Sequence, residues 1–108
     1  MSWDLSLEVV VDGVTCEIAG DYNYTHNTNP MIRAAGFTEW PYELDGMPAG
    51  AFAWKLGVAI AALQRDPDAF RAMNPENYWG DYDTLLAVLR EIFNDYRRLP
   101  SATVRCSA

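Results

Sequence analysis

A chain of 108 residues, half of them hydrophobic, is long enough to bury one core and too short for two independent ones. Fifteen Asp and Glu outnumber eight Lys and Arg, and this net charge of −7 excludes a protein that grips nucleic acid by its phosphates. No basic, apolar leader opens the chain, and no apolar run is long enough to cross a bilayer. We therefore expect a single cytoplasmic domain over residues 1–108, with no membrane partner.

Residues 5–19 predict a β-hairpin. Apolar and polar residues alternate on both sides of Asp12-Gly13, a dipeptide typical of the two-residue type I′ turn. The resulting register places three apolar pairs on one face, which must be buried: Val11 with Val14, Val9 with Cys16 and Leu7 with Ile18. On the other face Glu8 stands opposite Glu17, so that face is expected to be solvated or to receive a cation from elsewhere in the chain.

A polar segment, YNYTHNTNPMIRAAG, follows at residues 22–36. Asn29 before Pro30 is typical of a helix start, because Asn accepts from a free backbone N–H and Pro loses no hydrogen bond at the first helical position. Gly36 suits the position just beyond a helix end. The segment therefore predicts a short helix over Pro30–Ala35.

A longer helix is predicted over about Pro48–Gln64, because apolar residues recur there at helical spacing. Its stripe consists of Phe52, Leu56, Ile60 and Leu63. Asp66-Pro67 repeats the cap-then-proline pattern and predicts one further turn of helix carrying Phe70 and Met73.

The last helix is predicted over 81–98, with Gly80 or Asp81 at its start and Pro100 beyond its end. Its apolar stripe consists of Tyr82, Leu85, Leu86, Leu89, Ile92, Phe93 and Tyr96. Thr103–Cys106 alternates as a third strand beside the hairpin would. The expected fold class is α+β: a small antiparallel sheet, made of the hairpin and this C-terminal strand, packed against two main helices and short connecting helices.

The order of these segments resembles a known family. The hairpin, YNYTHNTNPMIRAAG, a helix ending LQRDPDAF and then MNPENYWGDYDTLLAVL are similar to small proteins encoded by bacteriophages and prophages, especially of actinobacteria. The resemblance covers Leu7–Pro100 and implies a viral or prophage origin and an accessory role, but no catalytic residue. It places two groups on the family pattern: Asn23, Thr25, His26, Asn27 and Met31, and Asn74, Pro75, Asn77, Trp79, Gly80 and Tyr82. Families with this pattern commonly have a glycine directly before the residue that corresponds to Trp79. This chain has Tyr78 at that position, which puts a tight turn there in doubt.

His26 is the only histidine in the chain, so the sequence predicts no cluster of metal ligands and no cofactor. A nucleophile signature such as Gly-x-Ser-x-Gly, which a histidine base would serve, is also missing. We expect His26 to pack near the hairpin exit and to bond to the backbone. Cys16 and Cys106 lie far apart in the sequence and are expected to be free thiols in a reducing cytoplasm, although a bridge between them stays open.

The segment 22–36 allows two interpretations. Asn and Thr side chains close local turns and cap helices, which would explain its polar residues with no ligand at all. Alternatively, Tyr22, Tyr24 and His26 alternate just before a helix start and would grip a base and a phosphate, with Asn27 beside them and Arg33 pairing with the negative charge.

The second polar motif, NPENYWGDYD, also reads as turn residues followed by a helix cap. Asp81 and Asp83 resemble a pair of catalytic carboxylates, but a helix start is the ordinary place for two acids. Ten Trp and Tyr are more than a small core absorbs, so some of six should reach the surface and mark an interaction site: Trp3, Trp40, Tyr42, Trp54, Tyr78 and Trp79.

Three functional hypotheses follow. The first, which we favour, is a non-enzymatic phage-type accessory protein that binds and modulates a host or phage protein, as in counter-defence. The second is a protein that binds or sequesters a small nucleotide-like ligand, as a homo-oligomer. The third is a small hydrolase that uses His26. The residues expected to bind a ligand or partner are Tyr22, Tyr24, His26, Asn27, Arg33, Trp40, Tyr78 and Trp79.

Overall fold

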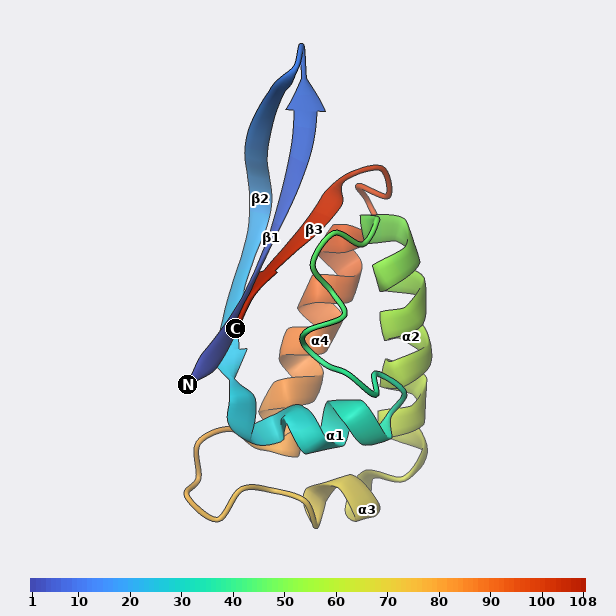
Figure 1. The fold of residues 1–108 in the computed structure, drawn as a ribbon. Coiled ribbons are helices and arrows are strands. Elements are labelled where there is room, and N and C mark those ends of the chain that lie inside the picture. The colour runs from blue at the N-terminus through green and yellow to red at the C-terminus, as the bar shows by residue number, and fades with distance from the viewer.

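The computed structural model describes the backbone of residues 1–108 and the side chains of all of them other than Ala19. Figure 1 shows the course of the chain through its strands and helices. Their bounds are, in chain order, β1 Ser2–Val11, β2 Val14–Thr25, the 3-10 turn η1 His26–Thr28, α1 Asn29–Ala34, α2 Ala49–Arg65, α3 Pro67–Arg71, α4 Tyr82–Tyr96 and β3 Thr103–Ser107.

The predicted hairpin is confirmed, with both strands longer than expected. Asp12 and Gly13 have φ angles of 51° and 77°, the positive values that a type I′ turn requires. The three predicted apolar pairs and the Glu8–Glu17 pair are all in register. The predicted third strand pairs antiparallel with β1, so the sheet order is β2-β1-β3. Arg105 on β3 supplies the cation expected on the polar face, with its Nε 2.6 Å from Oε1 of Glu8.

A bulge lengthens β2 relative to β1. Leu7 and Leu5 are two steps apart on β1, whereas their partners Ile18 and Tyr22 are four steps apart on β2. Gly20, within the surplus, has a φ of 111°, which favours glycine because it has no Cβ. Past the bulge β2 continues to Thr25, so the start of the polar segment is part of the sheet.

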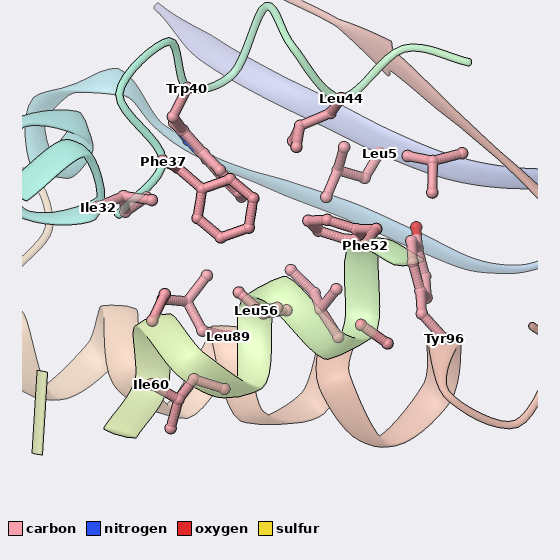
Figure 2. Packing of buried hydrophobic residues seen from close by; sticks show 14 of the residues in the cluster. Leu5, Ile32, Phe37, Trp40, Leu44, Phe52, Leu56, Ile60, Leu89 and Tyr96 are labelled. Carbon is pink, nitrogen blue, oxygen red and sulfur yellow. The ribbon is translucent and has the colours of Figure 1, made fainter. Parts of the chain in front are cut away.

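The helices cover one face of the sheet, as Figure 2 shows: α2 and α4 lie side by side, and the buried side chains fill the space between them and the strands. The whole predicted stripe of α2 is buried. On α4 the stripe is buried except for Leu86 and Phe93, which are half-buried. The fold is therefore α+β with a small antiparallel sheet, as predicted. Among the residues whose structure is described, no helix combines the length and the apolar composition that crossing a membrane needs.

Two of the three predicted helix caps are confirmed. Asp81 Oδ1 accepts from the N–H of Thr84 at 2.7 Å, and Asp66 Oδ1 accepts from the N–H of Ala69 at 3.4 Å. The prediction that Asn29 is an N-cap is wrong, because η1 runs directly into α1 and Asn29 has helical φ and ψ angles. Its side chain is buried and makes no cap hydrogen bond.

The prediction that one whole face of the hairpin is buried is wrong at its tip. Leu7 is fully buried, but Val11 and Val14 keep 54% and 61% of their surface exposed. The reason is the length of the hairpin, because its tip extends beyond the helices that cover this face (Figure 1), and β3 pairs with β1 only as far as Glu8. Beyond that point the two strands project past the helices as a free ribbon (Figure 1).

Candidate functional site

The two polar motifs of the sequence lie against each other in the fold. Asn27 Nδ2 donates to Asn77 Oδ1 at 3.4 Å. A Cβ built on Gly80 would lie 2.6 Å from Thr25 Cγ2 and 3.2 Å from the hydroxyl oxygen of Tyr24. The loop of residues 74–81, called here the aromatic loop, therefore rests directly on the end of β2 and on η1.

Side-chain acceptors hold both ends of the aromatic loop. Asn74 Oδ1 accepts from the N–H of Tyr82 at 2.9 Å, and Asn77 Oδ1 accepts from the N–H of Trp79 at 3.0 Å. Tyr82, the first residue of α4, is buried and donates its hydroxyl proton to the carbonyl of Leu63 at 2.8 Å. The loop is consequently tied to α4, α2 and η1, and its conformation is set from several sides.

Tyr78 and Trp79 point outward from this loop. Tyr78 is 93% exposed and Trp79 is 70% exposed. Tyr78 also has a φ of 61°, in the left-handed region that is unfavourable by roughly 1–2 kcal/mol for a residue with a Cβ. The tight turn before Trp79 therefore forms in this chain. Tyr78 adopts there a backbone conformation that suits glycine. The tyrosine gains almost no burial in return, so packing does not explain it.

Buried polar atoms lie behind the aromatic loop. The Tyr24 hydroxyl, His26 Nε2, Thr28 Oγ1 and Asn29 Oδ1 are enclosed and have no hydrogen-bond partner among the described side chains and backbone. Burial raises the pKa of Tyr24. The backbone N–H of His26 donates to the carbonyl of Met1 at 3.1 Å, whereas Nε2 of its imidazole does not make the expected bond to the backbone.

Two residues of the predicted ligand grip, Tyr22 and Arg33, are engaged in contacts within the fold. Both Nε and Nη2 of Arg33 donate to the carbonyl of Trp40, at 3.0 and 2.9 Å. The Tyr22 hydroxyl donates to Asp95 on α4, and burial followed by this contact raises the pKa of Tyr22. Arg33 thus makes a contact within the fold, and its pairing with a bound anion stays a prediction.

The prediction that Trp40 binds a partner at the surface is wrong. This residue is fully buried, with its ring 5.3 Å from that of Trp3 and 5.1 Å from that of Phe37. Large apolar rings bury the most surface, and here both tryptophans belong to the core. The expectation that some of six aromatic residues reach the surface is confirmed, since four do so: Tyr42, Trp54, Tyr78 and Trp79.

Tyr22 also lines a hollow of about 520 Å³ whose other walls include polar residues of the outer sheet face. Its carboxylates are Asp4, Glu17, Asp21 and Asp45, and Arg105 also lines it. A hydrogen bond with Asp21 raises the pKa of Glu17, which shows how closely the acids lie. Such a surface repels the phosphates of a nucleotide-like ligand.

The side chains of Asp81 and Asp83 both make contacts within the fold. Asp81 caps α4, and Asp83 Oδ1 lies 3.0 Å from Nη2 of Arg71, which lowers the pKa of Asp83. Sequence reasoning did not anticipate Asn77 as the residue that joins the two motifs. The sequence carries no signal for this contact, because Asn27 and Asn77 are 50 residues apart.

Comparison of the chain with protein-family models, with curated proteins and with solved structures finds no match. The likeness to phage-encoded proteins stays a prediction from sequence.

Proposed function

We propose that the protein is a non-enzymatic binding protein that docks a partner protein on Tyr78 and Trp79. The observation that carries this proposal is the left-handed φ of 61° at a tyrosine that is 93% exposed. Strained residues held in place by a surrounding structure cluster at functional sites. Exposed Trp and Tyr side chains are the residue types that most often dominate binding energy at protein interfaces.

The aromatic loop also suits this role because its conformation is fixed before a partner binds. The hydrogen bonds of Asn74 and Asn77 hold its backbone, so little conformational entropy is lost when Tyr78 and Trp79 enter a pocket. Glu76 and Asp81 are exposed beside the two rings. The partner surface that fits is an apolar pocket with a basic rim.

The resemblance to phage-encoded proteins favours a bacterial host protein as this partner, and the host cytoplasm as the place of action. In that setting the chain acts as an accessory protein that occupies or redirects a host factor, as in counter-defence. The small-ligand hypothesis has weaker support, because Arg33 is bound to Trp40 and the hollow at Tyr22 is acidic. The hydrolase hypothesis lacks a nucleophile bonded to Nε2 of His26.

The proposal is tested by photo-crosslinking in bacterial cells. A benzoylphenylalanine in place of Tyr78 keeps an aromatic ring on the loop and is expected to capture a discrete partner. The matched control carries the same group in place of Tyr42, which is also exposed at 71% but lies outside the loop. An excess of unmodified protein should suppress the crosslink, and the Tyr78→Ala, Trp79→Ala variant should compete at least about thirtyfold less well. Equal crosslinking at both positions, or equal competition by the variant, contradicts the proposal.

A further inference from the structure

The tip of the hairpin, residues 10–15, presents an apolar pair, Val11 and Val14, that is not packed against the hydrophobic core. Val11 and Val14 form a cross-strand pair and are 54% and 61% exposed. They point to the same side of the sheet as Leu7, which is buried against the helices, because side chains on a strand alternate. The tip face therefore lies on the side of the sheet that the helices cover, but it extends beyond the ends of the helices of its own chain.

A second uncovered apolar surface lies between α2 and α4. This α2–α4 groove has a volume of about 600 Å³, and its lining includes Gly50, Trp54, Gly57, Val58, Phe93 and Pro100. Trp54 and Val58 are 74% and 53% exposed. In α2 only Lys55, Gln64 and Arg65 are polar. A helix that is apolar all round is normally buried all round, so the outer face of α2 is suited to a contact with another chain.

The charges of the two surfaces are complementary. Arg97 lines the α2–α4 groove, and Arg90 lines the adjoining hollow that shares Gly57 and Phe93 with it. Neither lining contains a carboxylate, although the chain has fifteen acids and eight bases. The hairpin tip carries Asp12 in its turn and no base. An acidic apolar projection thus matches a basic apolar groove of the same chain.

We propose that two copies of the chain form a twofold dimer in which the tip face of each hairpin packs in the α2–α4 groove of the other. The second copy is related to the first by a twofold axis and lies at the hairpin end of the first copy. Its helices face the tip of the first copy, and its own sheet lies on the other side of those helices. The same rotation carries its own tip to the helices of the first copy. Both contacts form at once, and the assembly closes at two copies.

This dimer leaves the proposed partner site free. The aromatic loop lies at the opposite end of the molecule from the hairpin tip, as Figure 1 shows. The dimer therefore presents two aromatic loops at its two ends, and its formation does not depend on whether those loops bind a partner.

The experiment is sedimentation equilibrium on the full chain and on single glutamate variants. The wild type is expected at twice the chain mass of 12.1 kDa. Val11→Glu in the tip face and Val58→Glu in the groove should each raise the dimer dissociation constant about a hundredfold or more, because each buries an unpaired charge. Val10→Glu is the matched control: Val10 is 69% exposed on the opposite face of the same strand, so this variant should remain dimeric.

Mixing distinguishes the proposed contact from a helix-to-helix dimer. Val11→Glu and Val58→Glu should each be monomeric alone, yet form a heterodimer when mixed, because one tip and one groove stay intact between them. Val14→Glu gives a second tip variant, and an unchanged unfolding transition at high dilution shows that each variant folds. A monomeric wild type, a dimeric Val11→Glu or a mixture that stays monomeric would overturn the proposal.

Discussion

Tyr78 shows how a single residue carries most of the functional interpretation. Its neighbours fix its left-handed backbone: Asn77 bonds to the N–H of Trp79, and Gly80 packs against Thr25. A glycine at position 78 would adopt the same φ without a steric penalty. The tyrosine therefore stands against local conformational preference, which is the feature on which the proposed partner site rests.

Tyr78→Gly is expected to raise the free energy of unfolding by about 0.5–1 kcal/mol, because relief of the left-handed strain exceeds the extra entropy of glycine in the unfolded chain. Denaturation with urea measures the change. Tyr42→Gly is the control, since Tyr42 is similarly exposed but is not among the residues with positive φ. That substitution should lower stability or leave it unchanged. A destabilised Tyr78→Gly would mean that the tyrosine ring packs on the fold.

At the scale of elements, the aromatic loop and the end of β2 form one unit. The backbone of Gly80 passes so close to Thr25 and Tyr24 that a side chain at this position has no space. Asn27 and Asn77 join the same two segments by a hydrogen bond. A displacement of either motif therefore moves the other, and with it the two exposed rings.

Gly80→Ala is expected to destabilise the protein by about 1–3 kcal/mol more than Gly46→Ala. The two glycines have nearly equal φ angles, 88° and 89°, so the conformational penalty is matched. They differ in space: a Cβ at Gly80 meets Thr25 Cγ2 at 2.6 Å, whereas a Cβ at Gly46 has no atom within 4 Å. Thermal unfolding of both variants measures the difference. Equal effects would show that the loop moves away from β2 without loss.

At the scale of the whole molecule, two tyrosines join the sheet to the helix layer. The Tyr22 hydroxyl donates to Asp95 on α4, and the Tyr96 hydroxyl donates to the carbonyl of Gly20 at 2.7 Å (Figure 2 shows Tyr96 between the layers). Burial is the main cause that raises the pKa of both hydroxyls, and the carboxylate of Asp95 adds to it. Each of these hydrogen bonds needs the tyrosine proton, so deprotonation of either hydroxyl removes a bond between the layers.

The free energy of unfolding is expected to fall as the pH rises above about 10, the ordinary tyrosine pKa. The folded state holds these protons more tightly than the unfolded state, so the stabilisation is complete below that pH and is lost above it. Urea denaturation at increasing alkaline pH measures the slope. Tyr96→Phe should reduce the slope, and Tyr22→Phe with Tyr96→Phe should reduce it further. A slope that the double variant shares with the wild type would contradict this assignment.

Local sequence patterns predicted most of the fold. The hairpin register followed from Asp12-Gly13 and the alternation around it, and the two main helices followed from apolar stripes, because both signals depend on neighbours in the chain. The excess of aromatic residues predicted that some rings reach the surface but not which ones: Tyr78 and Trp79 do, whereas Trp3 and Trp40 are buried. Asn29 was misjudged as a cap because a 3-10 turn in front of a helix leaves no distinct trace in the sequence.

The sequence by itself thus determined the type and order of the elements and which face of each is apolar. Only the tertiary structure decided which of these surfaces meet. It buried Trp40, bound Arg33 to the Trp40 carbonyl, and left Val11 and Val14 uncovered. It also brought Asn27 and Asn77 together across 50 residues. Periodicity reports whether a side chain is apolar and where it points along its own element. Whether another element reaches it depends on the lengths and packing of segments far away in the chain.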